Sequence, residues 1–278
     1  MHINKELQLG FKPLIFLLIA LTVLLSACNS ASDNSSQTGK METADTLSYT
    51  SQTYRLESKL DKKPGDTIKE KTYFEAIYPV FEDSALNAYV ESLMVMNSNP
   101  DIEYTTLKES GEGFINSFDE YQQLDYSSPW PWYNNIRVKV LRNNPYYISF
   151  AVEYDDFMGG AHGNHGTNYG NYDLSLRREI ALTDMIEQGK MDSLTKVAEQ
   201  IFIKQEEMNE EETAFTDYFF EDGVFSLNNN FLLQDSSILF LYNIYEIKAY
   251  AAGTTKLEIP YADIESLLTP KAKEILNK

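Results

Sequence analysis

Alternating and helical patterns of hydrophobic residues run along the chain from about residue 48 to its end. Runs of β-branched and aromatic residues predict strands at 48–57, 72–78, 136–140, 147–154, 169–176, 230–233, 237–242 and 255–259. Apolar residues three and four positions apart predict helices at 84–94, 112–124, 192–207 and from Asp263 onward. The strands come in hairpin pairs and do not alternate strictly with helices, so we expect an α+β fold with antiparallel sheets packed against helices.

A glycine-rich stretch at residues 159–166 separates these elements into two groups. We therefore expect two small sub-domains, an N-terminal α+β domain at 48–158 and a C-terminal α+β domain at 159–278. Each is expected to pack its own antiparallel sheet against helices.

The first 28 residues have the pattern of a bacterial lipoprotein signal peptide. A short basic segment precedes an apolar run at residues 13–25, which is shorter than the ~20 residues that a membrane span needs. The run ends in the sequence LSAC at residues 25–28, which resembles the lipobox of bacterial lipoproteins. We expect cleavage before Cys28 and lipidation of its thiol, with an uncleaved N-terminal helix as the alternative.

Residues 29–47 are rich in Ser, Asn and Thr and predict a flexible tether between the lipid and the folded part. The whole chain has a formal charge of -19, and the chain from Cys28 onward has 21 basic and 41 acidic residues, a formal charge of -20. Such acidity argues against nucleic acid as a partner, because binding to phosphates needs clustered cations. We expect a lipoprotein anchored to a membrane through its N-terminal lipid and facing the periplasm or the cell exterior.

Most enzyme classes with a recognisable motif are excluded. One Cys and three His leave few residues for a zinc site or a Cys nucleophile. The chain has no G-x-S-x-G sequence, no phosphate-binding loop and no dinucleotide-binding fingerprint. The sequence therefore favours a protein without catalytic activity.

The glycine-rich stretch and its neighbours hold the main candidates for chemistry, namely Asp155, Asp156, His162, His165 and Asp173. Imidazole nitrogens and carboxylate oxygens are ligands for zinc or manganese, so one hypothesis is a divalent-metal or ligand-binding loop. Glycines around both imidazoles are instead typical of a tight turn whose polar side chains bond the backbone. We favour this structural interpretation and expect no cofactor.

An aromatic cluster, Trp130, Trp132 and Tyr133, follows Pro129 and includes Pro131. Two interpretations are open. These rings form a platform for a sugar or a protein partner, or they cover the hydrophobic core, which is the more common place for Trp and Tyr.

Several segments together resemble a known pair of domains. The matching segments lie at residues 73–79, 159–163, 171–174, 182–185, 245–253 and 259–261. The sequences GGAHG at 159–163 and YEIKAYAAG at 245–253 carry most of the resemblance. The pair it resembles is bacterial, extracytoplasmic and of unknown function. It is found in the lysozyme-sensing outer part of the anti-sigma-V factor and ahead of the catalytic domain in some peptidoglycan deacetylases.

The resemblance implies a binding or sensing role in the cell envelope, with cell-wall glycan or an envelope-active protein such as lysozyme as the ligand. The acidic charge favours encounter with a cationic partner. We expect neither a cytoplasmic sigma-binding domain before the apolar run nor an appended deacetylase. The alternatives are a metal-dependent envelope hydrolase centred on the glycine-rich loop and a purely structural role.

Overall fold

The fold is that of a computed structural model of the chain, which describes residues 47–60, 70–98, 102–124, 130–208, 215 and 217–276. The expected signal peptide with Cys28, and all but the last residue of the expected tether, lie outside these ranges. Within the described ranges, no helix is long and apolar enough to cross a membrane.

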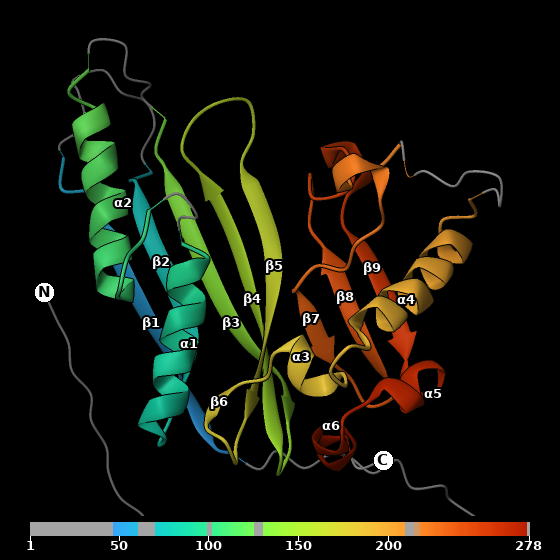
Figure 1. Cartoon of the computed structure of the whole chain (residues 1–278). Coiled ribbons are helices and arrows are strands. Elements are labelled where there is room, and N and C mark those ends of the chain that lie inside the picture. Colours follow the sequence, from blue (N-terminus) through green and yellow to red (C-terminus); the bar gives the residue numbers. More distant parts are fainter. Residues whose placement is uncertain are drawn as a thin grey trace, which may run out of the picture. The chain divides into compact units, whose positions relative to one another are not determined.

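Six strands form one sheet in the order β1-β2-β3-β4-β5-β6 (Figure 1). They are β1 (Tyr49–Glu57), β2 (Tyr73–Phe81), β3 (Tyr133–Asn143), β4 (Tyr147–Phe157), β5 (Asn164–Asp173) and β6 (Arg178–Glu179). Neighbouring strands are antiparallel except β2 and β3, which run parallel. The hairpin pattern did not predict this parallel pair, which forms because two helices carry the chain back between β2 and β3. The α+β class is confirmed.

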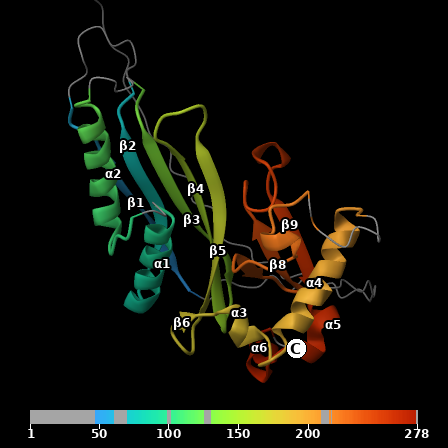
Figure 2. The same cartoon turned by 45° about the horizontal axis from the view of Figure 1, so that its top comes forward.

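Helices α1 (Ser84–Met96) and α2 (Leu107–Tyr121) cover one face of this sheet (Figures 1 and 2). The carboxylate of Asp83 caps α1 by accepting two backbone N–H bonds in its first turn. Apolar side chains from both helices and from β2 to β5 form the core beneath them, including Phe74, Leu86, Val90, Phe114, Ile136, Phe150 and Val152. Helix α2 begins five residues earlier than the apolar spacing predicts, because Thr106 caps it and accepts a bond from the Glu109 N–H.

The six-stranded sheet continues past the domain boundary expected between residues 158 and 159. That boundary falls in the connection between β4 and β5, and these strands pair from Tyr147 opposite Asp173 to Asp156 opposite Asn164. The glycine-rich stretch is therefore the turn and the first part of a long strand within one sheet.

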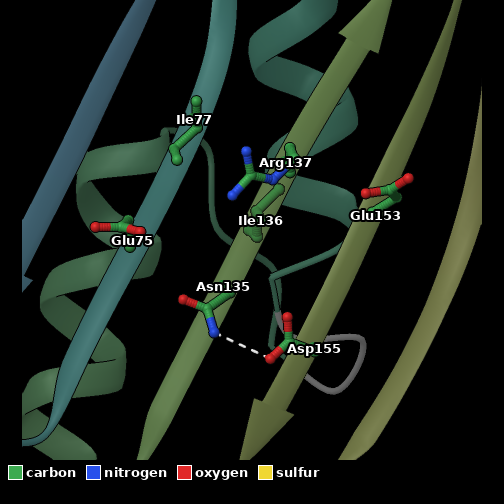
Figure 3. Close-up of a pocket in the computed structure, with 7 residues that line it drawn as sticks. All are labelled: Glu75, Ile77, Asn135, Ile136, Arg137, Glu153 and Asp155. Atoms are coloured by element: carbon green, nitrogen blue, oxygen red, sulfur yellow. Dashed lines mark hydrogen bonds between the residues drawn. The ribbon is translucent and has the colours of Figure 1, made fainter.

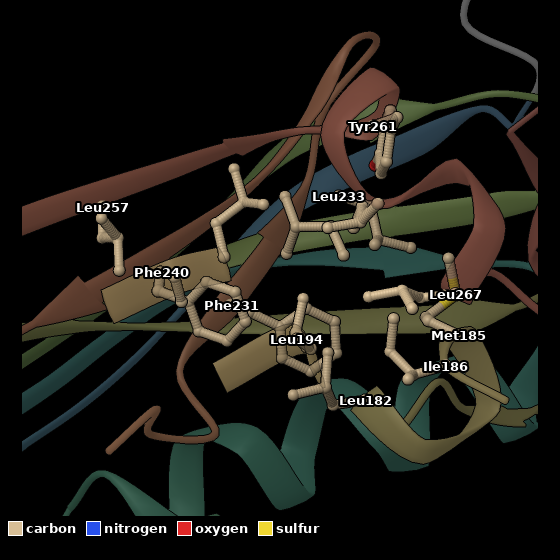
Figure 4. Close-up of a cluster of buried hydrophobic side chains, with 14 of the residues drawn as sticks. Leu182, Met185, Ile186, Leu194, Phe231, Leu233, Phe240, Leu257, Tyr261 and Leu267 are labelled. Carbon is tan, nitrogen blue, oxygen red and sulfur yellow. The ribbon is translucent and has the colours of Figure 1, made fainter. Parts of the chain in front are cut away.

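A second, antiparallel sheet contains β7 (Phe231–Leu233), β8 (Ser237–Tyr242) and β9 (Thr255–Pro260). The helices that accompany it are α3 (Leu182–Met185), α4 (Met191–Gln205), α5 (Tyr261–Ile264) and α6 (Pro270–Ile275), with short 3-10 helices at Glu221–Gly223, Tyr250–Ala252 and Glu265–Leu267. The expected final helix is thus divided into α5 and α6. Leu194 of α4, Phe240 of β8 and Leu257 of β9 are fully buried in the core of this part (Figure 4).

Three asparagines, Asn171, Asn230 and Asn243, connect the two sheets, and we call them the amide joint. The buried amide of Asn171 on β5 donates to the Phe231 carbonyl oxygen at 2.8 Å and accepts from the Leu233 N–H at 3.2 Å, both on β7. Its oxygen also accepts from the Ser149 hydroxyl at 2.7 Å. One side chain thus bonds both sheets.

The other two amides of the joint bond the backbone of β5 at an edge that has no neighbouring strand. The Asn243 oxygen accepts from the Thr167 N–H at 2.9 Å, and the Asn230 oxygen accepts from the Tyr169 N–H at 2.8 Å. Both amide nitrogens donate to the Thr167 carbonyl oxygen, at 3.1 and 2.9 Å. Side-chain amides therefore satisfy backbone groups that a partner strand otherwise bonds.

We predict that Asn171→Ala lowers the free energy of unfolding by roughly 2–4 kcal/mol, because it leaves buried backbone groups of β7 and the Ser149 hydroxyl without partners. Asn164→Ala, at an exposed position of the same strand, is the control and is expected to change it by less than ~0.5 kcal/mol. Urea unfolding measures both. Equal effects of the two substitutions would show that the joint does not hold the sheets together.

An ion pair between Lys248 and Glu206 lies near the end of α4. The Nζ to Oε2 distance is 2.5 Å, and the side chains are only 21% and 17% exposed. The Tyr218 hydroxyl also donates to Glu206, at 2.9 Å. Burial alone would raise the pKa of Glu206, but the bonds from Lys248 and Tyr218 outweigh burial and lower this pKa.

A lowered carboxyl pKa stabilises the fold above the unfolded value of ~4.3, and that stability is lost as the pH falls through the folded pKa. We predict that Lys248→Met costs roughly 1–3 kcal/mol of unfolding free energy at pH 7 and progressively less toward pH 3. Lys139→Met, which removes an exposed partner of Glu153, should cost no more than ~1 kcal/mol. Urea unfolding over this pH range tests the prediction, and a Lys248→Met cost independent of pH contradicts it.

Candidate functional site

The face of the six-stranded sheet opposite α1 and α2 is accessible at residues 73–77 of β2, 133–139 of β3 and 153–157 of β4, and we call this part the open face. Strand residues alternate between the two faces. Even positions such as Phe74, Ile136 and Val152 are buried beneath the helices, whereas the odd positions within 73–77, 133–139 and 153–157 are exposed or half-buried. A shallow cavity of about 210 Å³ lies on the open face (Figure 3). Its lining includes Glu75, Ile77, Asn135, Arg137, Glu153 and Asp155.

A row of stacked aromatic rings crosses three neighbouring strands of the open face. The Tyr73 and Tyr133 ring centroids are 6.3 Å apart with planes 22° from parallel, and those of Tyr133 and Phe157 are 6.1 Å apart at 25°. The Arg55 guanidinium lies 3.9 Å from the Tyr73 ring centroid. Burial, then the nearby Asp155, raise the pKa of Tyr133.

The next rows of the open face consist of planar and charged polar groups. Arg55 donates to Glu75 at 3.0 Å, and Asn135 donates to Asp155 at 3.0 Å. Further along β3 and β4, Lys139 pairs with Glu153 at 2.5 Å. Aromatic rings beside hydrogen-bonding carboxylates and amides suit a ligand with apolar patches and many hydroxyl or amide groups.

The glycine-rich loop contacts a loop that follows β8, at one end of the open face. The His162 ring centroid lies 4.8 Å from that of Tyr250 and 6.5 Å from that of Tyr245, and His165 meets Tyr250 edge-on at 5.8 Å. Tyr245 has a φ of 63°, which is uncommon for a bulky residue. The two sequence segments that carry the family resemblance therefore lie against each other.

The five residues considered for a metal or ligand loop are not brought together. Asp155 and His165 are directly opposite each other on β4 and β5. Asp156 points to the other face, where burial raises its pKa although Asn164 donates to it. His162 packs on Tyr250, as described above, and its Nδ1 lies 2.8 Å from the Gly163 carbonyl oxygen.

Asp173 is eight residues from His165 along β5, a distance of ~26 Å at ~3.3 Å per strand residue. It is buried and accepts hydrogen bonds from Ser175 and from the Leu176 N–H. Burial would raise the pKa of Asp173, but these bonds and nearby Lys271 lower it. Across the described part of the chain, no group of three or more His, Cys, Asp or Glu side chains is placed to hold a metal ion.

The three residues considered for an aromatic platform also diverge. Trp130 is 59% exposed. Trp132 packs against α2, 5.5 Å from Phe118 and 5.1 Å from Tyr121 between ring centroids. Tyr133 points to the open face, because successive residues of an extended chain point to opposite sides. Only Tyr133 belongs to the stacked row.

Sequence reasoning missed most of the open face, which includes Tyr73, Glu75, Asn135, Arg137, Glu153 and Phe157. One signal was available, because the alternation at 136–140 places Arg137 and Lys139 on one side of a strand. The register between strands was not available, and this register puts Tyr73 beside Tyr133 and Glu153 beside Arg137.

Comparisons with known proteins agree with the resemblance seen in the sequence. A family model described as deacetylase PdaC matches residues 66–165, from just before β2 to the start of β5. A second model, described as a protein of unknown function (DUF3298), matches residues 183–262, from α3 to α5. The two matches follow each other along the chain, consistent with the paired domains that its sequence resembles. The search of curated proteins returned no match.

Solved structures show the same fold in this pair of domains. A DUF3298 family member from Bacteroides fragilis is 21% identical and has a TM-score of 0.62, with 85% of this chain and 100% of that chain covered. A DUF3298 family protein from Pseudomonas aeruginosa is 20% identical with a TM-score of 0.62, and the match covers 82% of this chain and 97% of that one.

We predict that Gly163→Ala disturbs the glycine-rich loop between β4 and β5, because a Cβ there would lie 2.7 Å from the Asp156 carbonyl oxygen. The expected cost is roughly 1–3 kcal/mol of unfolding free energy. Asn164→Ala, at the exposed next position, is the control. Thermal unfolding measures both, and an equal or smaller cost at Gly163 is the contradicting result.

Proposed function

We propose that this chain is a lipid-anchored protein of the cell envelope that binds cell-wall glycan on the open face and has no catalytic activity. The anchor is the lipidated Cys28, and the acidic folded part faces the periplasm or the cell exterior at the end of its tether. The proposal requires no cofactor.

The stacked row of Tyr73, Tyr133 and Phe157, beside the polar rows of the cavity, is the observation that carries the proposal. Sugar rings have apolar C–H patches that contact aromatic rings and hydroxyls that bond carboxylates and amides. Asp155 and Asn135 present such groups next to the rings. The face is shallow and crosses several strands, which suits part of a polymer better than a small enclosed substrate.

The carboxylates near the open face support binding without catalysis. A general acid needs a raised pKa and access to the substrate. Asp156 has a raised pKa, but its side chain points away from the open face. On the open face, Glu153 is paired with Lys139 and Asp155 accepts from Asn135.

Thermal unfolding of the chain from Asn29 onward tests this function. We predict that soluble peptidoglycan fragments raise the melting temperature, because a ligand at 100 times its Kd stabilises the native state by ~2.7 kcal/mol. Asp155→Asn should reduce the shift. Glu112→Gln, at an exposed site on the helical face, should leave it unchanged.

The same thermal-unfolding measurement with lysozyme, zinc or manganese tests the alternative ligands. A shift with lysozyme alone would replace the glycan by a cationic protein partner, in agreement with the charge of -20. A shift with metal alone that disappears in His162→Ala would favour the metal-dependent hydrolase. No shift with peptidoglycan fragments contradicts the proposed glycan binding.

A further inference from the structure

Arg137 is a cation on the open face whose hydrogen-bonding groups are unused. It lies on β3, is exposed, and lines the cavity (Figure 3). Among the described residues, none forms a hydrogen bond or ion pair with its guanidinium, in contrast to Arg55 and Lys139 on the same face. Its five N–H donors are therefore available to a ligand.

The acidic neighbours of Arg137 already have other partners. Glu153 is directly opposite Arg137 on β4 but pairs with Lys139, and Glu75 on β2 pairs with Arg55. Asp155 accepts from Asn135. The strand register places Ile77, an apolar side chain, directly opposite Arg137 on β2. The guanidinium is thus held among carboxylates that do not bond it.

We propose that Arg137 binds a carboxylate of the ligand, so that the open face selects an acidic cell-wall glycan over a neutral one. This inference rests on the proposed function and adds the chemical class of the glycan. A guanidinium bonds a carboxylate through two parallel N–H donors, the strongest hydrogen-bonded pairing open to this side chain.

The carboxylates of the cavity, although each has one partner, can accept further hydrogen bonds from donors on the same ligand. Glu75, Glu153 and Asp155 accept hydrogen bonds and donate none when ionised. A neutral oligosaccharide supplies donors for these groups, but it offers Arg137 only neutral hydroxyl and amide oxygens, which bond a guanidinium less strongly than a carboxylate does. A glycan with both hydroxyl or amide donors and a carboxylate satisfies the whole set, whether the carboxylate belongs to the sugar or to an attached peptide.

Isothermal titration calorimetry with three probes tests the inference. The probes are a disaccharide-peptide from peptidoglycan, the same saccharide without its peptide but with a free ether-linked carboxylate, and a neutral chitin oligosaccharide. We expect the wild-type chain to bind at least one acidic probe about 10-fold or more tightly than the neutral one. The preferred acidic probe identifies whether the sugar or the peptide supplies the carboxylate.

Arg137→Gln should remove this preference by weakening acidic probes about 10-fold or more while leaving the neutral probe unchanged. Arg137→Lys, which keeps the charge but loses the planar fork, should fall between them. Arg177→Gln, at a cation paired with Asp83 near α1, is the matched control and should keep the preference. Melting temperatures confirm that each variant is folded.

Equal affinity of the wild-type chain for acidic and neutral probes overturns the inference and leaves the proposed glycan binding intact. A preference that survives in Arg137→Gln also overturns it. Failure of all three saccharides to bind contradicts the proposed function itself.

Discussion

The amide joint decides which surface of this protein remains accessible. Strand β5 has a free edge at Thr167 and Tyr169, and an unpaired buried edge is costly because its backbone groups lose their bonds to water. Asn230 and Asn243 bond this edge, and Asn171 reaches from β5 to β7. Side chains, and not strand pairing, therefore join the second sheet to the first, and they do so at β5. The odd-numbered positions within 73–77, 133–139 and 153–157 stay exposed or half-buried and form the open face.

The open face and the helical face differ because each strand alternates. On one side, Phe74, Ile136 and Val152 exclude water beneath α1 and α2. On the other side, Tyr73 and Tyr133 stack, and charged groups occupy the following rows. The exposed ion pairs among these groups contribute little stability. The ligand that we propose binds at these groups, where Arg137 has no hydrogen bond or ion pair with any of the described residues.

Local sequence signals predicted the elements whose causes are local. The cap at Asp83 and the apolar stripe of α1 are one example, and the α+β class follows from such elements. Features set by distant residues were not predicted. The parallel pairing of β2 with β3 depends on the path through α1 and α2. The length of β5 was hidden because its glycines look like a linker, whereas Gly170 is needed where α1 packs closely.

In the candidate site, too, neighbours in the sequence are not always neighbours in the structure. Asp155 and Asp156 are neighbours in sequence, yet the strand sends them to opposite faces, and Trp132 and Tyr133 diverge for the same reason. Asp173 was grouped with His165 by proximity in sequence, but an extended strand separates them. Conversely, the segment at 159–163 and the segment at 245–253 are distant in sequence and meet through His162 and Tyr250.

The most direct test of the account is to map the ligand-binding surface by NMR. Soluble peptidoglycan fragments would be titrated into the ¹⁵N-labelled chain from Asn29 onward, and changes in the backbone amide signals would be recorded residue by residue. We expect changes concentrated at 73–77, 133–139 and 153–157, with smaller ones in the loop around His162. Changes confined to α1 and α2, or to the β7-β8-β9 sheet, would contradict it.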